Sequence, residues 1–151
     1  MQRVMIAALI GLGGTFASGA AAQEAHVWTV EDDFAAVTFA LENAIVGAGL
    51  VVDHVSHTGE MLERTREATG SATVLFTQAD IYSFCSATVS RAVMEANPAN
   101  VQFCPYTVFA YETPDQPGVI TVGFRDYPAG EMDQVEALLG SIVAEALMLE
   151  P

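Results

Sequence analysis

The chain has 151 residues, 52% of them hydrophobic, and carries 19 acidic residues against five arginines and no lysine. This length predicts a single domain, and the hydrophobic content is high enough for a packed core. A formal net charge of −14 repels phosphate backbones and anionic lipid surfaces, which argues against nucleic-acid binding and against polybasic association with a membrane surface.

Residues 1–22 have the pattern of a cleaved export signal. Arg3 supplies a short positive start, an apolar run rich in Gly and Ala follows, and three alanines precede the bond Ala22–Gln23. No later segment is long and apolar enough to span a bilayer. The sequence therefore predicts a signal peptide over 1–22 with cleavage near Ala22–Gln23. The mature single domain, 23–151, is expected to be periplasmic or secreted, with no membrane span.

A strand and a long helix are expected at the start of the mature chain. His26 to Val30 has the composition of a short strand, and the acidic run 31–33 places carboxylates where a helix start favours them. From Phe34 to Ala48 apolar residues recur at helical spacing, and Gly47 or Gly49 ends the run.

The middle of the chain predicts two more strands and two more helices. Leu50 to Ser56 is rich in β-branched residues and is expected to be a strand, and 58–69 is polar enough to be a short surface helix. Ala72 to Thr77 is expected to be the next strand. A helix is predicted over 86–96, ended by Asn97-Pro98.

The last third predicts a hairpin and a long helix. Strands over 106–111 and 119–124 flank a loop dense in turn residues, 113–118. One wide apolar stripe runs along 132–147 and indicates an amphipathic helix. The expected fold is α+β: a mostly antiparallel five-stranded sheet with two long helices on one face, in the order strand, helix, four strands, helix. An open sheet of this kind leaves an unpaired edge, which allows homodimerisation.

Three segments carry a family resemblance: 47–52, which reads Gly-Ala-Gly-Leu-Val-Val, 83–87 and 103–112. On these segments the chain from Asp33 to about Phe124 resembles the domain of unknown function 302 family, as an exported, two-cysteine variant. That family shows a Leu-Pro-Cys segment where this chain has Phe103-Cys104-Pro105. The resemblance implies a fold similar to the TATA-binding-protein-like group, and the biochemical function of the family is not generally established.

Cys85 and Cys104 allow three interpretations. In an oxidising compartment two cysteines are first a candidate disulfide, which would stabilise the fold by about 3 kcal/mol for a loop of this length. A thiol redox or sulfur-carrier pair is the second, because Cys85 precedes a predicted helix start that would favour its thiolate, with Cys104 resolving. Ligation of a soft metal or of haem is the third.

If the cysteines bind a metal, His57 is the histidine expected to join them; the favoured alternative is that His57 is a surface histidine without a ligand role. Residues three apart on a strand point to opposite faces, so only one of His54 and His57 can face the cysteines. His57 lies at the strand end, where sites gather. With Cys85 and Cys104 it supplies three of the ligands that zinc requires. Covalent c-type haem is excluded because the chain has no Cys-x-x-Cys-His motif, and noncovalent haem stays an alternative. His26 is discounted because it lies near the mature terminus.

Aromatic residues near the cysteines offer a candidate ligand site. Phe84, Phe103 and Tyr106 are expected either to pack in the core or to line a pocket. Arg91 is a scarce cation that either forms an ion pair or orients an anionic ligand. The chain has neither a Gly-x-Ser-x-Gly nor a His-Glu-x-x-His motif, and no catalytic residue is predicted.

The favoured hypothesis is a periplasmic ligand-binding or accessory protein held by a Cys85–Cys104 disulfide, with a small ligand or a protein as partner and no reaction of its own. The alternatives are a thiol redox or sulfur-carrier protein that uses both cysteines, and a metal or haem protein that uses His57 with them. The sequence requires no cofactor.

Overall fold

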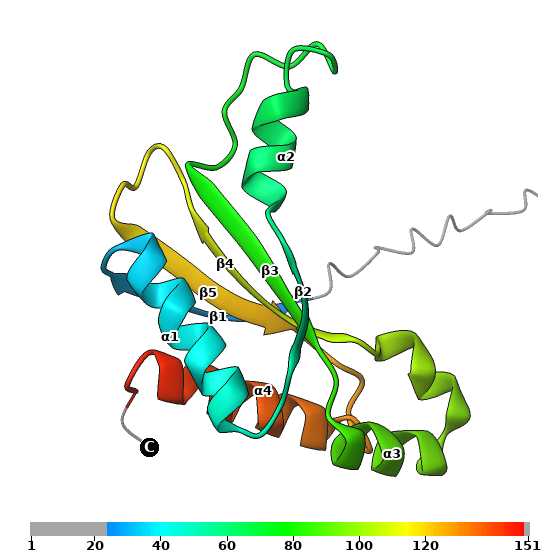
Figure 1. Ribbon diagram of the computed structural model, residues 1–151. Helices are drawn as coiled ribbons and strands as arrows, with labels where there is room; N and C mark the ends of the chain where they lie inside the picture. The colour runs from blue at the N-terminus through cyan, green and yellow to red at the C-terminus, as the bar shows by residue number, and fades with distance from the viewer. Residues whose placement is uncertain (1–23, 150–151) are drawn as a thin grey trace, which may run out of the picture.

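A five-stranded antiparallel sheet is the frame of the computed structural model, which describes residues 24–149 (Figure 1). Its strands lie in the order β1-β5-β4-β3-β2, so the β4–β5 hairpin is central and β1 and β2 are the two edges. The strands are β1 (Ala25–Glu31), β2 (Val52–Ser56), β3 (Gln78–Phe84), β4 (Tyr106–Glu112) and β5 (Val119–Arg125).

Two long helices lie side by side on one face of this sheet: α1 (Phe34–Gly47) and α4 (Asp133–Ala146) (Figure 1). The shorter helices lie at opposite ends of the sheet, α2 (Thr58–Thr65) at one end and α3 (Ala87–Ala96) at the other. A 3₁₀ helix, η1 (Pro98–Phe103), follows α3 and leads into β4. The predicted fold class, an α+β fold with this element order, is confirmed.

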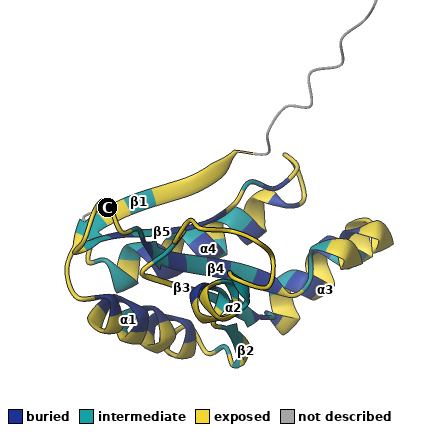
Figure 2. Cartoon of the chain, turned by 90° about the horizontal axis from the view of Figure 1, so that it is seen from above, coloured by how far each residue is buried: buried dark blue, intermediate teal, exposed yellow. Residues whose placement is uncertain are grey.

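Helix α1 begins directly after Asp33, which caps it: the Asp33 carboxylate accepts hydrogen bonds from the backbone N–H groups of Ala35 and Ala36. Its apolar stripe is buried against the sheet, while its other side is exposed (Figure 2). The chain leaves the helix at Gly49, whose φ of +77° favours glycine. The predicted helix over 34–48 is therefore confirmed to within a residue.

The core lies between these two helices and the sheet. Alternate residues of the central strands point into it, as the pleat of a strand requires, and they meet the apolar stripes of α1 and α4. Its largest fully buried side chains are Tyr106, Phe84, Leu41, Ile45, Ile120, Met132, Leu139 and Ile142.

The predicted strand over 72–77 is wrong, because this stretch is a mostly exposed loop and the strand is β3, Gln78–Phe84. Val74 and Leu75 have the composition of a strand, but both are largely exposed. The segment that follows forms the strand instead, because Tyr82 and Phe84 fill the core and its whole length pairs with β4. Tertiary packing therefore overrides local β propensity here.

Residues 1–23 lie outside the described part, so the predicted signal peptide and its cleavage site stay predictions. No helix within residues 24–149 is long and apolar enough to cross a membrane.

We predict that Gly123→Ala destabilises the protein. Gly123 of β5 pairs with both β1 and β4, and an added Cβ would overlap the main-chain carbonyl oxygen of His26 and come within 2.8 Å of the Phe109 ring. The free energy of unfolding should fall by about 1–3 kcal/mol in urea titration. Gly140→Ala is the control: its Cβ would meet nothing within 4 Å, so helix propensity should raise stability by up to about 1 kcal/mol. An unchanged midpoint for Gly123→Ala would contradict the close β1–β5 approach.

Candidate functional site

A groove of about 640 Å³ opens between the first turn of α1, helix α2 and the start of β3. Gly59 allows α2 to approach β3, because a Cβ at this position would lie 2.7 Å from the backbone nitrogen of Ala79. The groove has an apolar side and a charged side. Its lining includes Phe34, Thr38, His57, Glu60, Glu63, Val74, Phe76, Ala79, Asp80 and Pro114.

Strand pairing brings Asp80 and His57 together on the charged side. Asp80 is on the same face of β3 as Tyr82, but near the start of the strand, where the groove opens. β2 pairs Ser56 with Ile81, so His57, which directly follows β2, comes beside Asp80. His57 Nδ1 lies 2.8 Å from Asp80 Oδ1, a normal hydrogen-bond distance. The Asp80 side chain is only 16% exposed, whereas that of His57 is 57% exposed.

The hydrogen bond from His57 to Asp80 and the negative charge of Asp80 raise the pKa of the imidazole above its ordinary value, and Glu60 adds to the effect. A second carboxylate of the groove, Glu63, forms an ion pair with Arg66 at 3.0 Å. Glu60 is exposed and adds a third carboxylate. The charged side of the groove is therefore predominantly anionic when His57 is neutral.

The apolar side of the groove is built from α1 and from the loop that joins α2 to β3. Phe34 is buried where α1 starts, and Val74 of the loop is 44% exposed. The ring of Phe76 packs edge-on against Tyr111 at a centroid distance of 5.4 Å, which fixes its position. An apolar surface beside fixed carboxylates can accommodate a small molecule that has an apolar body and a cationic group.

The cysteines lie at the other end of β3 and are bonded to each other. Cys85 directly follows β3 and Cys104 ends η1, and their Cα atoms are 6.5 Å apart. The disulfide closes a loop that contains α3 and η1. Ser90 of α3 packs beneath it, with Oγ 3.9 Å from Cys104 Sγ and 3.2 Å from the hydroxyl of Tyr106. The predicted Cys85–Cys104 disulfide is confirmed.

The structure does not bring His57 to the cysteines. His57 is beside Asp80 near the start of β3, whereas Cys85 follows the end of that strand, which places them about 17 Å apart along β3. Both sulfur atoms are also used in the disulfide. The three ligands expected for a zinc or haem site therefore do not meet.

The aromatic residues named from the sequence have different environments. Phe84 and Tyr106 are fully buried and hold the core. Phe103 is half-buried, with its ring packed edge-on against Tyr127, so part of it faces solvent. The Arg91 side chain is 79% exposed and pairs with Glu95 at 2.8 Å on α3. A ligand-binding role for these residues stays a prediction, and none of them lines the groove.

Three residues of the groove, Asp80, Glu60 and Phe76, are not identified as site residues by the sequence. Asp80 falls in a stretch that was not assigned to a strand, and its partner His57 is 23 residues away in the chain. The available signal was a carboxylate that alternates with Tyr82 and Phe84 and therefore shares their buried face.

The fold is similar to that of a solved structure, the crystal structure of the uncharacterized conserved protein DUF302 from Bacillus stearothermophilus. The TM-score is 0.60, the sequences are 17% identical, and the match covers 84% of this chain and 98% of that chain. At this identity the likeness shows a shared fold, and at that level it supports the resemblance to the domain of unknown function 302 family. No protein-family model and no curated protein matches the chain.

We predict that the double variant Cys85→Ser/Cys104→Ser is less stable by about 3 kcal/mol, because the disulfide removes loop entropy from the unfolded chain. The measurement is urea unfolding of the double variant, with reduced wild type as a control that should show the same shift. An unchanged midpoint, or alkylation of either cysteine in the native non-reduced protein, would contradict a structural bond.

A second prediction concerns the titration of His57. Its NMR midpoint should lie above 6.5, and Asp80→Asn should lower it by removing the carboxylate that raises the pKa. Because the folded-state pKa is raised, the pair stabilises the protein fully below pH 6.5, and this contribution is lost as the pH rises through the raised pKa. Equal midpoints in the two proteins would show that Asp80 is not the partner.

Proposed function

We propose that the mature chain is an exported ligand-binding domain, without a reaction of its own, whose groove takes a small organic cation with an apolar body. The observation that carries this proposal is the carboxylate of Asp80, which is largely buried at the charged side of a groove whose other side is apolar. Export is supported by the signal pattern of residues 1–22 and agrees with the disulfide, since disulfides persist mainly in oxidising compartments.

The size of the groove fits a small molecule. Sites for small ligands commonly measure about 300–1,000 Å³ and combine apolar walls with a few placed polar groups. At about 640 Å³ this groove lies within that range. The rings of Phe34 and Phe76 offer apolar contact, and an aromatic ring that is fixed in place also attracts an ammonium group.

Charge selects the kind of ligand. A carboxylate that is mostly removed from water requires a cationic or hydrogen-bonding partner, and Asp80 has His57 in this role. Above the raised pKa of His57 the imidazole is neutral, so a ligand ammonium group can compensate the charge of Asp80 better than His57 does. Glu60 at the edge of the groove adds attraction for a cation and repulsion for an anion.

The disulfide supports this function from a distance. It holds α3 and η1 at the end of β3 that is remote from the groove, so it stabilises the frame without contacting the ligand. This arrangement accords with a domain that stays folded outside the cell and binds at a preformed site.

We predict that phenethylamine binds the wild-type protein and that 2-phenylethanol, its uncharged analogue, binds at least tenfold more weakly. Both are followed by amide chemical shifts in NMR titrations at pH 8. Asp80→Asn should reduce the affinity for phenethylamine at least tenfold and leave that for 2-phenylethanol unchanged, because it removes only the charge. Glu95→Gln is the matched control, since Glu95 is a carboxylate paired with Arg91 on α3, outside the groove.

Equal affinity for the two probes, or equal loss in Asp80→Asn and Glu95→Gln, would refute cation recognition by the groove. Shifts that gather around Phe103 and Arg91 instead would move the site to the predicted aromatic cluster.

A further inference from the structure

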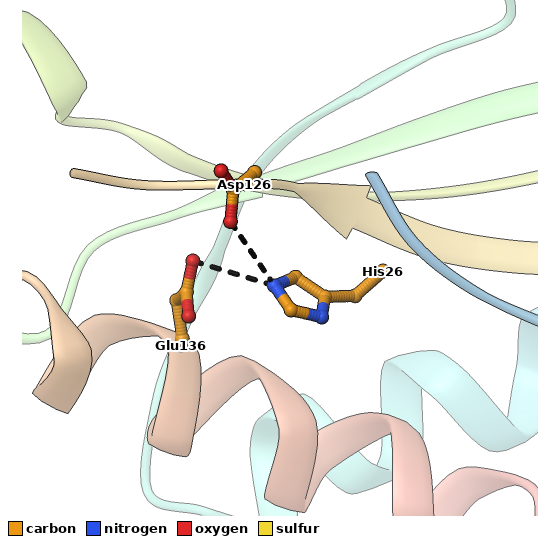
Figure 3. A group of neighbouring side chains, drawn as sticks. All are labelled: His26, Asp126 and Glu136. Carbon is orange, nitrogen blue, oxygen red and sulfur yellow. Dashed lines mark ion pairs between the residues drawn. The ribbon is translucent and has the colours of Figure 1, made fainter. Parts of the chain in front are cut away.

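Three side chains from three elements meet where β1, the end of β5 and α4 come together (Figure 3). His26 belongs to edge strand β1, Asp126 directly follows β5, and Glu136 lies in the first turn of α4. Each is partly exposed, with side-chain exposures of 43%, 49% and 25%. These residues are separated by up to 110 positions in the chain, and only the fold brings them together.

The distances within this cluster are longer than a direct hydrogen bond and are compatible with a metal site. His26 Nε2 lies 3.4 Å from Asp126 Oδ1 and 3.4 Å from Glu136 Oε1, and Figure 3 shows it directed between the two carboxylates. A direct N–H···O bond is about 2.9 Å, as in the 2.8 Å contact of His57 with Asp80. In contrast, two ligands that each lie about 2.1 Å from a tetrahedral zinc ion are about 3.4 Å apart. All the ligand atoms lie within 4.8 Å of one another.

The three ligands are held by contacts of their own. The backbone N–H of Tyr127 donates to Glu136 Oε1 at 2.7 Å, which orients that carboxylate and leaves it a further lone pair. The backbone N–H of Asp126 donates to the carbonyl oxygen of Glu24 at 2.9 Å. The ring of His26 lies against Phe124, with centroids 4.9 Å apart. Such supporting contacts set the geometry of metal ligands before the ion arrives.

We propose that His26, Asp126 and Glu136 bind one divalent transition-metal ion of the zinc type. One imidazole nitrogen and two carboxylate oxygens suit zinc and its neighbours, whereas magnesium and calcium prefer oxygen alone. Two carboxylates and a neutral imidazole carry a charge of −2, which a dication compensates. Three protein ligands leave a fourth position for water or for an external ligand. This site is separate from the groove, because none of its three residues lines the groove.

The test is a zinc titration of tag-free mature protein, stripped of metal beforehand, followed by calorimetry. Wild type should bind one zinc ion, and His26→Ala and Glu136→Gln should each weaken the affinity at least tenfold. Gln keeps the oxygen that accepts from Tyr127, so that variant removes the charge with little disturbance. His57→Gln is the matched control, because it removes another histidine near a carboxylate, and it should bind zinc as wild type does.

Amide shifts in wild type are a readout that needs no variant, and on adding zinc they should change first at residues 26, 126 and 136. Absence of binding at millimolar zinc would overturn the proposal, leaving an ion pair between the imidazolium and the carboxylates. Equal affinity of His26→Ala and wild type, or shifts that gather at His57, would also overturn it.

Discussion

The antiparallel pairing of β3 with β4 determines the positions of both the groove, at one end of β3, and the disulfide, at the other end. Over its full length it sets Asp80 opposite Ala110 and Phe84 opposite Tyr106. The first pair puts a carboxylate at the mouth of the groove, and β2 then adds His57 beside it. The second pair places the segment that follows β3 beside the segment that precedes β4, so the sulfur atoms of Cys85 and Cys104 meet. A slip of one residue would turn Asp80 to the other face of the sheet.

Scarcity of positive charge gives the two proposed sites a common cause. With 19 acidic residues, five arginines and no lysine, the chain has few cations of its own to place beside carboxylates that folding brings together. In two places a histidine is the partner of a carboxylate instead: His57 lies beside Asp80, and His26 lies beside Glu136. Histidine is a weak counter-charge near neutral pH, because it is only partly protonated there. A ligand cation or a metal ion can therefore supply the positive charge that the chain lacks. We propose a ligand cation for the groove, where one largely buried carboxylate faces apolar side chains, and a metal ion for the cluster in which three ligand atoms converge.

Much of the frame could be predicted from the sequence because the elements involved have strong periodicity. Helices α1 and α4 and the β4–β5 hairpin were all expected close to their observed bounds, and the disulfide followed from the presumed compartment. The sequence misplaces β3 because Val74 and Leu75 have high β propensity. Which segment forms the strand depends instead on how Tyr82 and Phe84 fill the core. The sequence could not assemble either site, since each brings together residues that are distant in the chain. The alternation of Asp80 with Tyr82 and Phe84 indicates which face Asp80 shares, but it does not give the register that places His57 beside it.

The most direct measurement of the central claim, that a ligand cation takes the place of His57 as partner of Asp80, is the pKa of His57 with the groove occupied. By linkage, a cation that binds Asp80 more tightly when the imidazole is neutral must lower the pKa of that imidazole. NMR titration of His57 at saturating phenethylamine should therefore give a midpoint below that of the free protein, moved toward 6.5. The same midpoint with and without phenethylamine would contradict the account, because it would show that the cation and His57 do not share this carboxylate.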